Sequence, residues 1–434
     1  MIAHISGLGS RLKHFVPLFI LTALLSGCSA AATGSNLKVL YGTDRSVTCD
    51  GAEIVGFGNH RSKADHGNPP PASCPEDGKR ISEPLVAYGV CNSRPDESAK
   101  LLTGDALDQS QTGHPLRDRG RFKQQLERAL DEGGKRAQGI LLFVHGFNVG
   151  FADACREAGE IVKEWGFDGV PVIWSWPSKR LNRLERGLLA IPFVNVLALG
   201  VAYLHDETDN EWSVPRFRDF LRDVIATAGT KRVHIAAHSM GNRLLRMALL
   251  RLLARGEHRE LADKLRSLTF FAPDVDYDVF ADAAGELVRE VCQPPCEATL
   301  YVSEKDQALT ASRGVHINHF RAGHFHWFQE NVGDRKSPLV AAGLNTVDAT
   351  LVDKPGLGHS YYRELGFELC PTLYLGDTDE KKRHCGTAEP KWRRLKIGLE
   401  PPRYFLKLCP TGDNQWVVQP VEPAEKCPER PDTR

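Results

Sequence analysis

Apolar and polar positions along the chain fall into two recurring patterns. Short runs of consecutive apolar residues that end in turn-forming residues are typical of strands buried on both faces. Segments with apolar residues three and four positions apart are typical of helices that pack on one side. From residue 139 onward the two patterns alternate. This alternation predicts parallel strands joined by right-handed crossover helices, and therefore an open α/β sheet.

The patterns locate most of the expected elements. Strands are predicted at 37–41, 85–90, 139–146, 170–176, 232–238, 268–272, 298–302, 345–350, 395–399 and 404–408. Helices are predicted at 121–132, 151–165, 215–227 and 243–253. Residues 50–80 are rich in Gly, Pro and charge and show no periodicity, so a long loop or insertion is expected there.

Composition narrows the class of protein. The chain has 434 residues, 41% of them apolar and 25% charged, as in ordinary globular proteins, and its length suits two or three domains. Lys and Arg total 55 and Asp and Glu total 55, so the net charge is zero. This balance gives no basic footprint for nucleic acid. No internal run is long and uncharged enough for a polytopic membrane protein.

The N-terminus predicts export and lipidation. Arg11 and Lys13 precede a short apolar stretch at 15–25, and Leu25-Ser-Gly-Cys28 follows. A basic lead, a short apolar core and small residues form a signal peptide, here 1–27. The pattern resembles a bacterial lipobox, which implies a lipid (palmitate-type acyl chains) on Cys28; an ordinary secretory signal or a retained anchor is the alternative. Ser29 in place of Asp favours the outer membrane, facing the periplasm. Residues 28–36 would be a tether, and membrane contact would run through the lipid anchor.

Eleven cysteines fit an oxidising compartment, because exported proteins keep disulfide bonds. Without Cys28 an even number remains. Nearest neighbours suggest four pairs, with Cys91 and Cys155 left over to pair across the sequence, although spacing does not determine connectivity. The four are Cys49–Cys74, Cys292–Cys296, Cys370–Cys385 and Cys409–Cys427. A zinc site at Cys292 and Cys296 is disfavoured, because no second Cys or His pair stands at a suitable distance.

The segment Ala237-His-Ser-Met-Gly241 is the strongest chemical signal. It joins a predicted strand to a predicted helix, and a serine in so tight a turn is exposed above the sheet over the helix N-terminus. Gly241 fits the G-x-S-x-G pattern, while Ala237 replaces its first glycine. Ser239 could also be a helix N-cap. With a strand before it and a helix after it, the nucleophile interpretation is favoured.

Five motifs in order make residues 39–362 resemble the α/β-hydrolase superfamily. Within it, the chain is similar to exported bacterial hydrolase-like proteins of unassigned function. The resemblance is specific for fold and weak for substrate. The motifs are Gly-Thr-Asp-Arg at 42–45, Phe-Val-His-Gly-Phe-Asn at 143–148, Ser-Trp-Pro-Ser at 175–178, Ala-His-Ser-Met-Gly-Asn at 237–242 and Gly-His-Ser-Tyr-Tyr at 358–362.

The resemblance implies the remaining site residues. In this fold the order along the chain is serine, acid, histidine, which makes His359 the base. Asp306 is favoured as the acid because it follows the next-to-last strand, with Asp274 as the alternative acid; Asp348 is assigned to structure. The amides of Met240 and Phe147 would form the oxyanion hole. Asn148 holds the Phe147 loop or forms an Asx-type turn. No cofactor is expected.

Three further segments carry weaker signals. Residues 179–204, apolar from 188 on, form either a lid or a buried helix, and the buried helix is favoured. His316, His319, His324 and His326 cluster without a common metal-ligand spacing, so a metal site is not expected. Residues 37–368 would form the hydrolase domain, and 369–434 a cysteine-rich module or cap that the resemblance does not cover.

These observations favour a serine hydrolase of the bacterial envelope. It would cleave an ester, thioester or amide of a small-molecule or lipid acyl substrate through an acyl-enzyme on Ser239, with esterase or lipase chemistry favoured by Trp174, Trp176 and Phe147 near the site. Two alternatives stay open. One is a non-catalytic envelope scaffold that retains the fold; the other is a metal-dependent hydrolase built on the histidine cluster.

Overall fold

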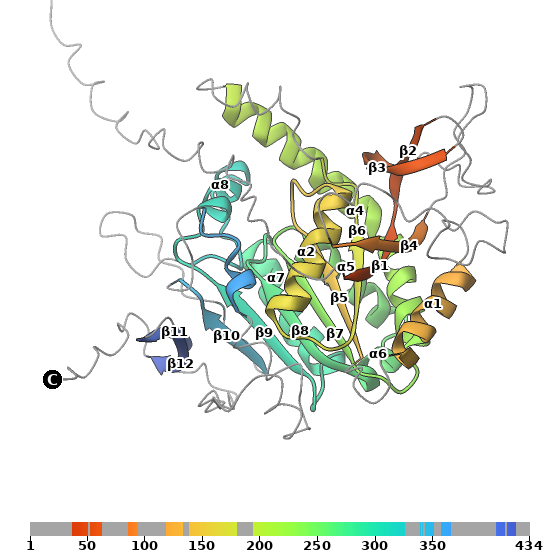
Figure 1. Ribbon diagram of the computed structural model, residues 1–434. Coiled ribbons are helices and arrows are strands. Elements are labelled where there is room, and N and C mark those ends of the chain that lie inside the picture. Colours follow the sequence, from red (N-terminus) through yellow and green to blue (C-terminus); the bar gives the residue numbers. More distant parts are fainter. Residues whose placement is uncertain are drawn as a thin grey trace, which may run out of the picture.

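A computed structural model describes most of the central part of the chain (Figure 1). The described residues are 37–50, 53–62, 86–93, 119–132, 139–179, 194–325, 339, 341, 343–350, 357–365, 405–412 and 415–421. The predicted signal peptide, the predicted tether and most of the C-terminal segment lie outside them. Among the described helices, none combines the length and apolar character needed to cross a lipid bilayer.

A mostly parallel sheet forms the centre of the molecule, as the alternating pattern predicts. Within the described residues it has ten strands in the order β12-β11-β10-β9-β8-β7-β5-β6-β1-β4. All neighbours are parallel except the two outermost pairs, β1 with β4 and β11 with β12. The strands are β1 Lys38–Thr43, β4 Ala87–Asn92, β5 Ile140–Val144, β6 Val170–Ser175, β7 Val233–His238, β8 Leu265–Phe271, β9 Glu297–Val302, β10 Leu344–Asp348, β11 Phe405–Gly412 and β12 Gln415–Val421.

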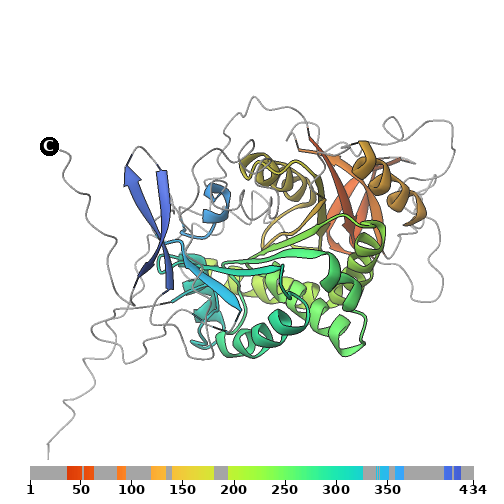
Figure 2. The same cartoon turned by 90° about the horizontal axis from the view of Figure 1, so that it is seen from below.

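Helices cover both faces of this sheet (Figure 2). One apolar core joins the sheet to α1, α4, α5 and α7, and two others join it to α2, α8 and the short 3₁₀ helix η4. Strands β5, β6 and β7 are buried along their whole length, which explains their unbroken apolar runs. The helices are α1 Arg119–Glu132, α2 Phe151–Glu164, α4 Val194–Thr227, α5 Gly241–Ala254, α6 Arg259–Lys264, α7 Tyr277–Glu290, α8 Gln307–Val315 and η4 Tyr361–Glu364.

The loop prediction for residues 50–80 was wrong at its start. A two-stranded sheet pairs β2, Arg45–Asp50, with β3, Glu53–Arg61. Two register shifts interrupt this pairing. A Cβ at Gly58 would lie 2.7 Å from the Ser46 hydroxyl, so this glycine, which the sequence pattern marks as a loop residue, lies close to the partner strand.

Helix α4 begins 21 residues before the Pro215 start that the sequence predicts, since it runs from Val194. Its middle is polar, which hides the helical pattern, yet Asp206, Asn210 and Ser213 are buried. Their side chains bond to other segments: Asp206 accepts from the Ser178 hydroxyl at 2.6 Å, and Asn210 donates to the Met240 carbonyl at 3.3 Å. Tertiary hydrogen bonds therefore keep this stretch helical.

Strands β11 and β12 extend the sheet beyond β10. The contact is short: Val347 pairs with Leu406 and Asp348 with Lys407 in the parallel register. The hairpin β11–β12 itself pairs along nearly all its length. The predicted strand at 404–408 corresponds to the start of β11, and the one at 395–399 lies outside the described residues. A part of the C-terminal segment thus continues the central sheet.

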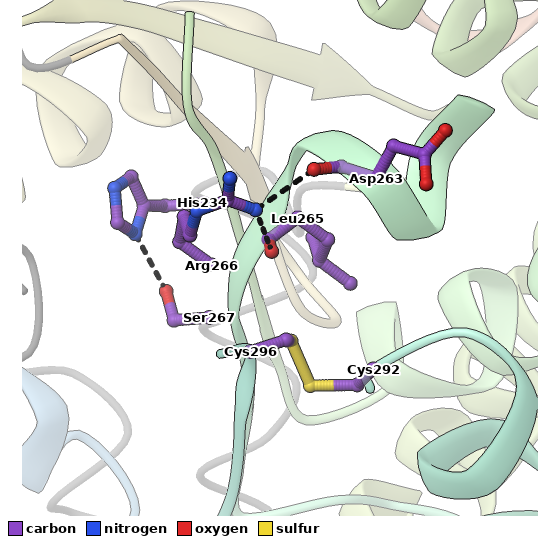
Figure 3. The surroundings of a disulfide bond; sticks show 7 residues. All are labelled: His234, Asp263, Leu265, Arg266, Ser267, Cys292 and Cys296. Atoms are coloured by element: carbon purple, nitrogen blue, oxygen red, sulfur yellow. Dashed lines mark hydrogen bonds between the residues drawn. A yellow bond between two sulfur atoms is a disulfide. The ribbon is translucent and has the colours of Figure 1, made fainter. Parts of the chain in front are cut away.

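Two disulfide bonds lie in the described part of the chain. Cys91 of β4 bonds to Cys155 of α2, and Cys292 bonds to Cys296 just after α7 (Figure 3). Both pairs are among those that the sequence suggests. Linking Cys91 to Cys155 closes a long segment, worth about 4 kcal/mol in the chain-entropy model. The other suggested pairs involve side chains outside the described residues.

Candidate active site

Ser239 occupies a sharp turn between β7 and α5. Its φ of 52° lies in the left-handed region, which is costly for a residue with a side chain and is held by surrounding bonds. The Ser239 amide donates to the Phe271 carbonyl at 2.9 Å. The Asn242 side-chain amide donates to the carbonyls of Ser239 and Phe271, at 3.1 and 3.0 Å. Neighbouring strand β8 therefore fixes the strained turn.

Two glycines let the backbone come close to this turn. A Cβ at Gly241 would lie 2.5 Å from the His145 carbonyl oxygen, so the turn closes against β5 only with glycine there. A Cβ at Gly146 would lie 2.9 Å from the Ser239 Cβ. The loop that follows β5 therefore passes directly beside Ser239.

His359 and Asp306 form a hydrogen-bonded pair. The distance from His359 Nδ1 to Asp306 Oδ2 is 2.7 Å. Asp306 is fully buried, whereas the His359 side chain is 14% exposed. Burial raises the pKa of the Asp306 carboxyl, and the charge and hydrogen bond of His359 oppose that rise. The second Asp306 oxygen accepts from the Leu309 amide at 2.9 Å and so caps α8. Both carboxylate oxygens are thus fixed, and one of them orients the imidazole.

The loop that carries His359 lies against the end of β7. The His359 carbonyl oxygen is 2.9 Å from Nε2 of His238, the residue before Ser239, and the two rings are 4.6 Å apart between centroids. Burial, followed by the nearby His359, lowers the pKa of His238 and keeps it neutral. Tyr361 anchors the same loop, since its hydroxyl donates to the Tyr301 carbonyl at 2.8 Å. The structure therefore brings the segments of Ser239, His359 and Asp306 to one edge of the sheet.

The amides of Phe147 and Met240 are placed on either side of the same turn. Met240 follows Ser239 directly, and Phe147 follows Gly146, the glycine next to Ser239. Within the described residues, neither N–H group donates a hydrogen bond to another protein atom. Asn148, which follows, has a φ of 60° and completes the turn. Two unused amide donors next to a strained serine are the elements of an oxyanion hole.

Asp274, the alternative acid, has other partners. Its carboxylate accepts from the hydroxyls of Tyr203 and Ser312, both at 2.6 Å, and from Arg321 Nε at 2.7 Å. Burial alone would raise the pKa of Asp274, but Arg321 and these hydrogen bonds outweigh it and hold the pKa below its usual value. The Asp274 amide also donates to the Ser239 carbonyl at 3.2 Å. Asp274 therefore ties α4 and α8 to the serine turn, while Asp306 contacts the histidine.

A second polar cluster, centred on Arg45, was not predicted. The buried guanidinium donates to Ser175 Oγ at 2.9 Å, to the Ser178 carbonyl at 3.1 Å and to the Val149 carbonyl at 2.7 Å. The ring of His145 stacks on Trp176, and burial and the Arg45 charge lower its pKa to about 3. The motifs at 42–45, 143–148 and 175–178 thus meet at Arg45. The signal in the sequence was the presence of these three motifs, which assigned no role to Arg45.

Trp174, Trp176 and Asp348 have structural roles. Trp174 and Trp176 are fully buried in the core, so they offer no surface to a substrate. Asp348 ends β10 and accepts from the Thr350 amide at 2.8 Å.

The histidine cluster and the predicted lid are only partly described. The described residues contain no group of three metal-ligating side chains, His326 lying outside them. His316 is paired with Glu207 at 3.3 Å, and His319 with Asp276 at 3.4 Å. Of residues 179–204, only the first residue and the start of α4 are described. In the latter, Tyr203 is buried while Val201 and Leu204 are exposed.

A mostly parallel sheet with a strained serine between strand and helix, followed along the chain by a buried acid and a histidine, defines an α/β hydrolase. A match to a known protein family agrees with this fold. Residues 119–370, more than half of the chain, match the model of a family described as alpha/beta hydrolase of unknown function, DUF900. The chain belongs to this family. No curated protein and no solved structure gives a significant match.

Proposed function

We propose that the protein is a serine hydrolase whose catalytic groups are Ser239, His359 and Asp306. The observation that carries this proposal is the 2.7 Å hydrogen bond between His359 Nδ1 and the buried Asp306, in a loop that packs beside the strained serine turn. Asp306 fixes the tautomer of His359, which leaves Nε2 as the atom able to accept a proton. A positioned base is what a serine hydroxyl needs to become a nucleophile.

The reaction follows from these positions. Ser239 Oγ attacks the acyl carbon while His359 Nε2 takes its proton, and the resulting oxyanion accepts hydrogen bonds from the Met240 and Phe147 amides. Collapse of the tetrahedral intermediate expels the alcohol, thiol or amine, which takes the proton from His359, and leaves an acyl-enzyme. Water then attacks the acyl-enzyme with His359 again as base, and Ser239 is released. The bond cleaved is that of an ester, thioester or amide.

An activated serine can be detected without knowing the substrate. A fluorophosphonate probe is expected to label the folded protein at one site, and Ser239→Ala to abolish labelling. Ser267→Ala is the control: Ser267 is buried and bonds to His234 at 2.9 Å, at the far end of β8 (Figure 3). Labelling at another residue, or none in a folded protein, would support the non-catalytic scaffold instead. Loss of turnover with a chelator would support the metal-dependent alternative.

We also propose that the protein is a lipoprotein of the bacterial envelope, anchored through Cys28 in the outer membrane and facing the periplasm. Two disulfide bonds in the described residues support an oxidising location. Metabolic labelling with palmitate tests the anchor: the wild type should incorporate label and Cys28→Ser should not. Equal labelling of both would exclude lipidation at Cys28.

A panel of acyl esters of increasing chain length sharpens the substrate class. Hydrolysis by the wild type and loss of hydrolysis in Ser239→Ala would establish the esterase activity. A preference for long chains would favour lipids as substrates over small soluble esters.

A further inference from the structure

A hollow of about 490 Å³ opens between α4, α5, α7 and the segment that follows α8. Its volume lies within the roughly 300–1,000 Å³ usual for small-molecule sites. Its wall includes Arg243 and Arg246 of α5, Val279 of α7, and Val315 and Ile317 at the end of α8. None of the proposed catalytic or oxyanion residues lines it. The hollow is therefore a separate feature from the proposed active site.

Most charges around the hollow are already matched. Arg243 pairs with Glu207 and, at 3.0 Å, with Glu211. Arg321 pairs with the buried Asp274. Asp276 accepts from the amides of Asp278 and Val279 and caps α7.

Arg246 is the exception in this wall. Within the described part of the chain its guanidinium makes no hydrogen bond or ion pair, and its Nε is buried without a partner. Burial and the neighbouring Arg243 lower the pKa of Arg246 from its usual value. No acidic side chain is among the groups that act on the pKa of Arg246. An anion bound in the hollow would supply a counter-charge.

Apolar side chains surround this cation. Val279, Val315 and Ile317 are 45%, 36% and 88% exposed. Ile317 also has a φ of 53°, a conformation that is strained for a β-branched residue. This left-handed residue ends α8, where the Asn318 amide donates to the Arg313 carbonyl at 2.9 Å, and it leaves the Ile317 side chain at the rim of the hollow. The hollow thus combines one unmatched cation with an apolar rim.

We propose that this hollow binds a long-chain carboxylate, with its head on Arg246 and its chain along Val279, Val315 and Ile317. A guanidinium fork matches a carboxylate in shape and in its single charge. A phosphate monoester carries more charge than the one unmatched cation balances. The proposal goes beyond the hydrolase function and does not require Ser239 to be a nucleophile.

Binding of dodecanoate, measured by calorimetry below its micelle concentration, tests the proposal. The full-length protein with Ser239→Ala is used, so that catalysis plays no part. Arg246→Gln should weaken binding by about tenfold or more, as expected for a charge-assisted hydrogen bond. Arg251→Gln, an exposed position on the same helix, should leave the affinity unchanged. Dodecanol, which has the same chain and no charge, should bind more weakly than dodecanoate and should not respond to Arg246→Gln.

Three results would overturn the assignment: no binding of dodecanoate, equal binding by the Arg246→Gln variant, or tighter binding of dodecyl phosphate. Ile317→Gly provides an independent check. Glycine relieves the positive φ and should raise the thermal midpoint, yet it should weaken dodecanoate binding because apolar contact is lost. An unchanged affinity in this variant would contradict the role of the rim.

Discussion

The Arg45 cluster and the Ser239–His359–Asp306 group both lie at the carboxyl ends of the central strands. Each includes a histidine. They differ in what their polar groups bind. Arg45 is bonded to fixed carbonyls and hydroxyls, and the ring of His145 is stacked on Trp176. His359 is held by Asp306 through Nδ1 and is partly exposed. The amides of Phe147 and Met240 bond to no described atom.

This difference separates a scaffold from the proposed reactive site. A polar cluster whose groups are bonded internally holds segments together and has nothing to offer a substrate. A reactive site keeps a base oriented on one side only, together with donors that the resting protein does not use. The five sequence motifs contribute to both clusters, so a motif alone does not identify a catalytic residue.

The largest expected effect tests the reactive side of this comparison. Asp306→Asn should lower kcat, or the rate of fluorophosphonate labelling, by about 10⁴-fold, because His359 loses the partner that sets its tautomer. The asparagine oxygen can still cap α8, so the fold should persist. Asp274→Asn is the matched change and should mainly lower the free energy of unfolding. If Asp274→Asn abolished labelling and Asp306→Asn did not, the two roles would be reversed.

Removing Arg45 tests the scaffold side. Arg45→Met leaves the Ser175 hydroxyl and the Val149 and Ser178 carbonyls without their donor, at a cost of about 3–5 kcal/mol in unfolding free energy. Urea unfolding measures the loss. Arg289→Met, which breaks an exposed pair with Glu290, should cost less than about 1 kcal/mol. Normal stability with loss of labelling would move Arg45 to the reactive group.

His234 is a buried histidine near the start of β7, outside both clusters, and Figure 3 shows it beside Ser267. Burial lowers its pKa to about 3, so the unfolded chain takes up a proton below pH 6.5 and the folded protein does not. Stability is therefore lost as the pH falls from 6.5, by about 2 kcal/mol at pH 5 for this group. Urea midpoints at pH 7.5 and 5.0 should differ less in His234→Gln than in the wild type. An identical pH dependence would show that His234 does not titrate in this way.

The smallest expected effect concerns Tyr203, which lies beside Phe147 and bonds to Asp274. The Tyr203 ring lies 5.5 Å from the Phe147 ring, and its hydroxyl bonds to Asp274. Tyr203→Phe keeps the ring and removes that bond to a charged carboxylate, which is worth about 1.5 kcal/mol. If Tyr203 positions the Phe147 loop, kcat should fall about fivefold with little change in KM. A change in stability alone, with kcat preserved, would reduce Tyr203 to a structural role.

The sequence predicts the sheet better than the helices around it. Buried strands such as β5 and β7 are apolar throughout, and that signal is local. Helices α7 and α8 were not predicted, and α4 was placed too late. In α4 the cause is visible: its buried Asp206, Asn210 and Ser213 are stabilised by partners far along the chain. No window of neighbouring residues contains those partners.

The same contrast holds in the candidate site, where some residues could be predicted from local sequence and others could not. The order serine, acid, histidine and the position after β9 were enough to choose Asp306, and the geometry places it on His359. The network of Asp274 depends on Arg321, Ser312 and Tyr203, which come from three separate segments. Its convergence is set by the fold alone. The same holds for the stacking of His145 on Trp176.

The bond between Cys91 and Cys155 has a mechanical consequence. Strand β1 follows directly on the N-terminal residues and lies between β4 and β6. A pull on the chain before Leu37 loads β1 along its length, and six residue pairs with β4 share that load. Because the disulfide joins Cys91 of β4 to Cys155 of α2, force on β1 would be passed through β4 to a helix of the central core. In the proposed lipid-anchored protein, the Cys91–Cys155 disulfide would therefore reinforce the part of the sheet nearest the anchor.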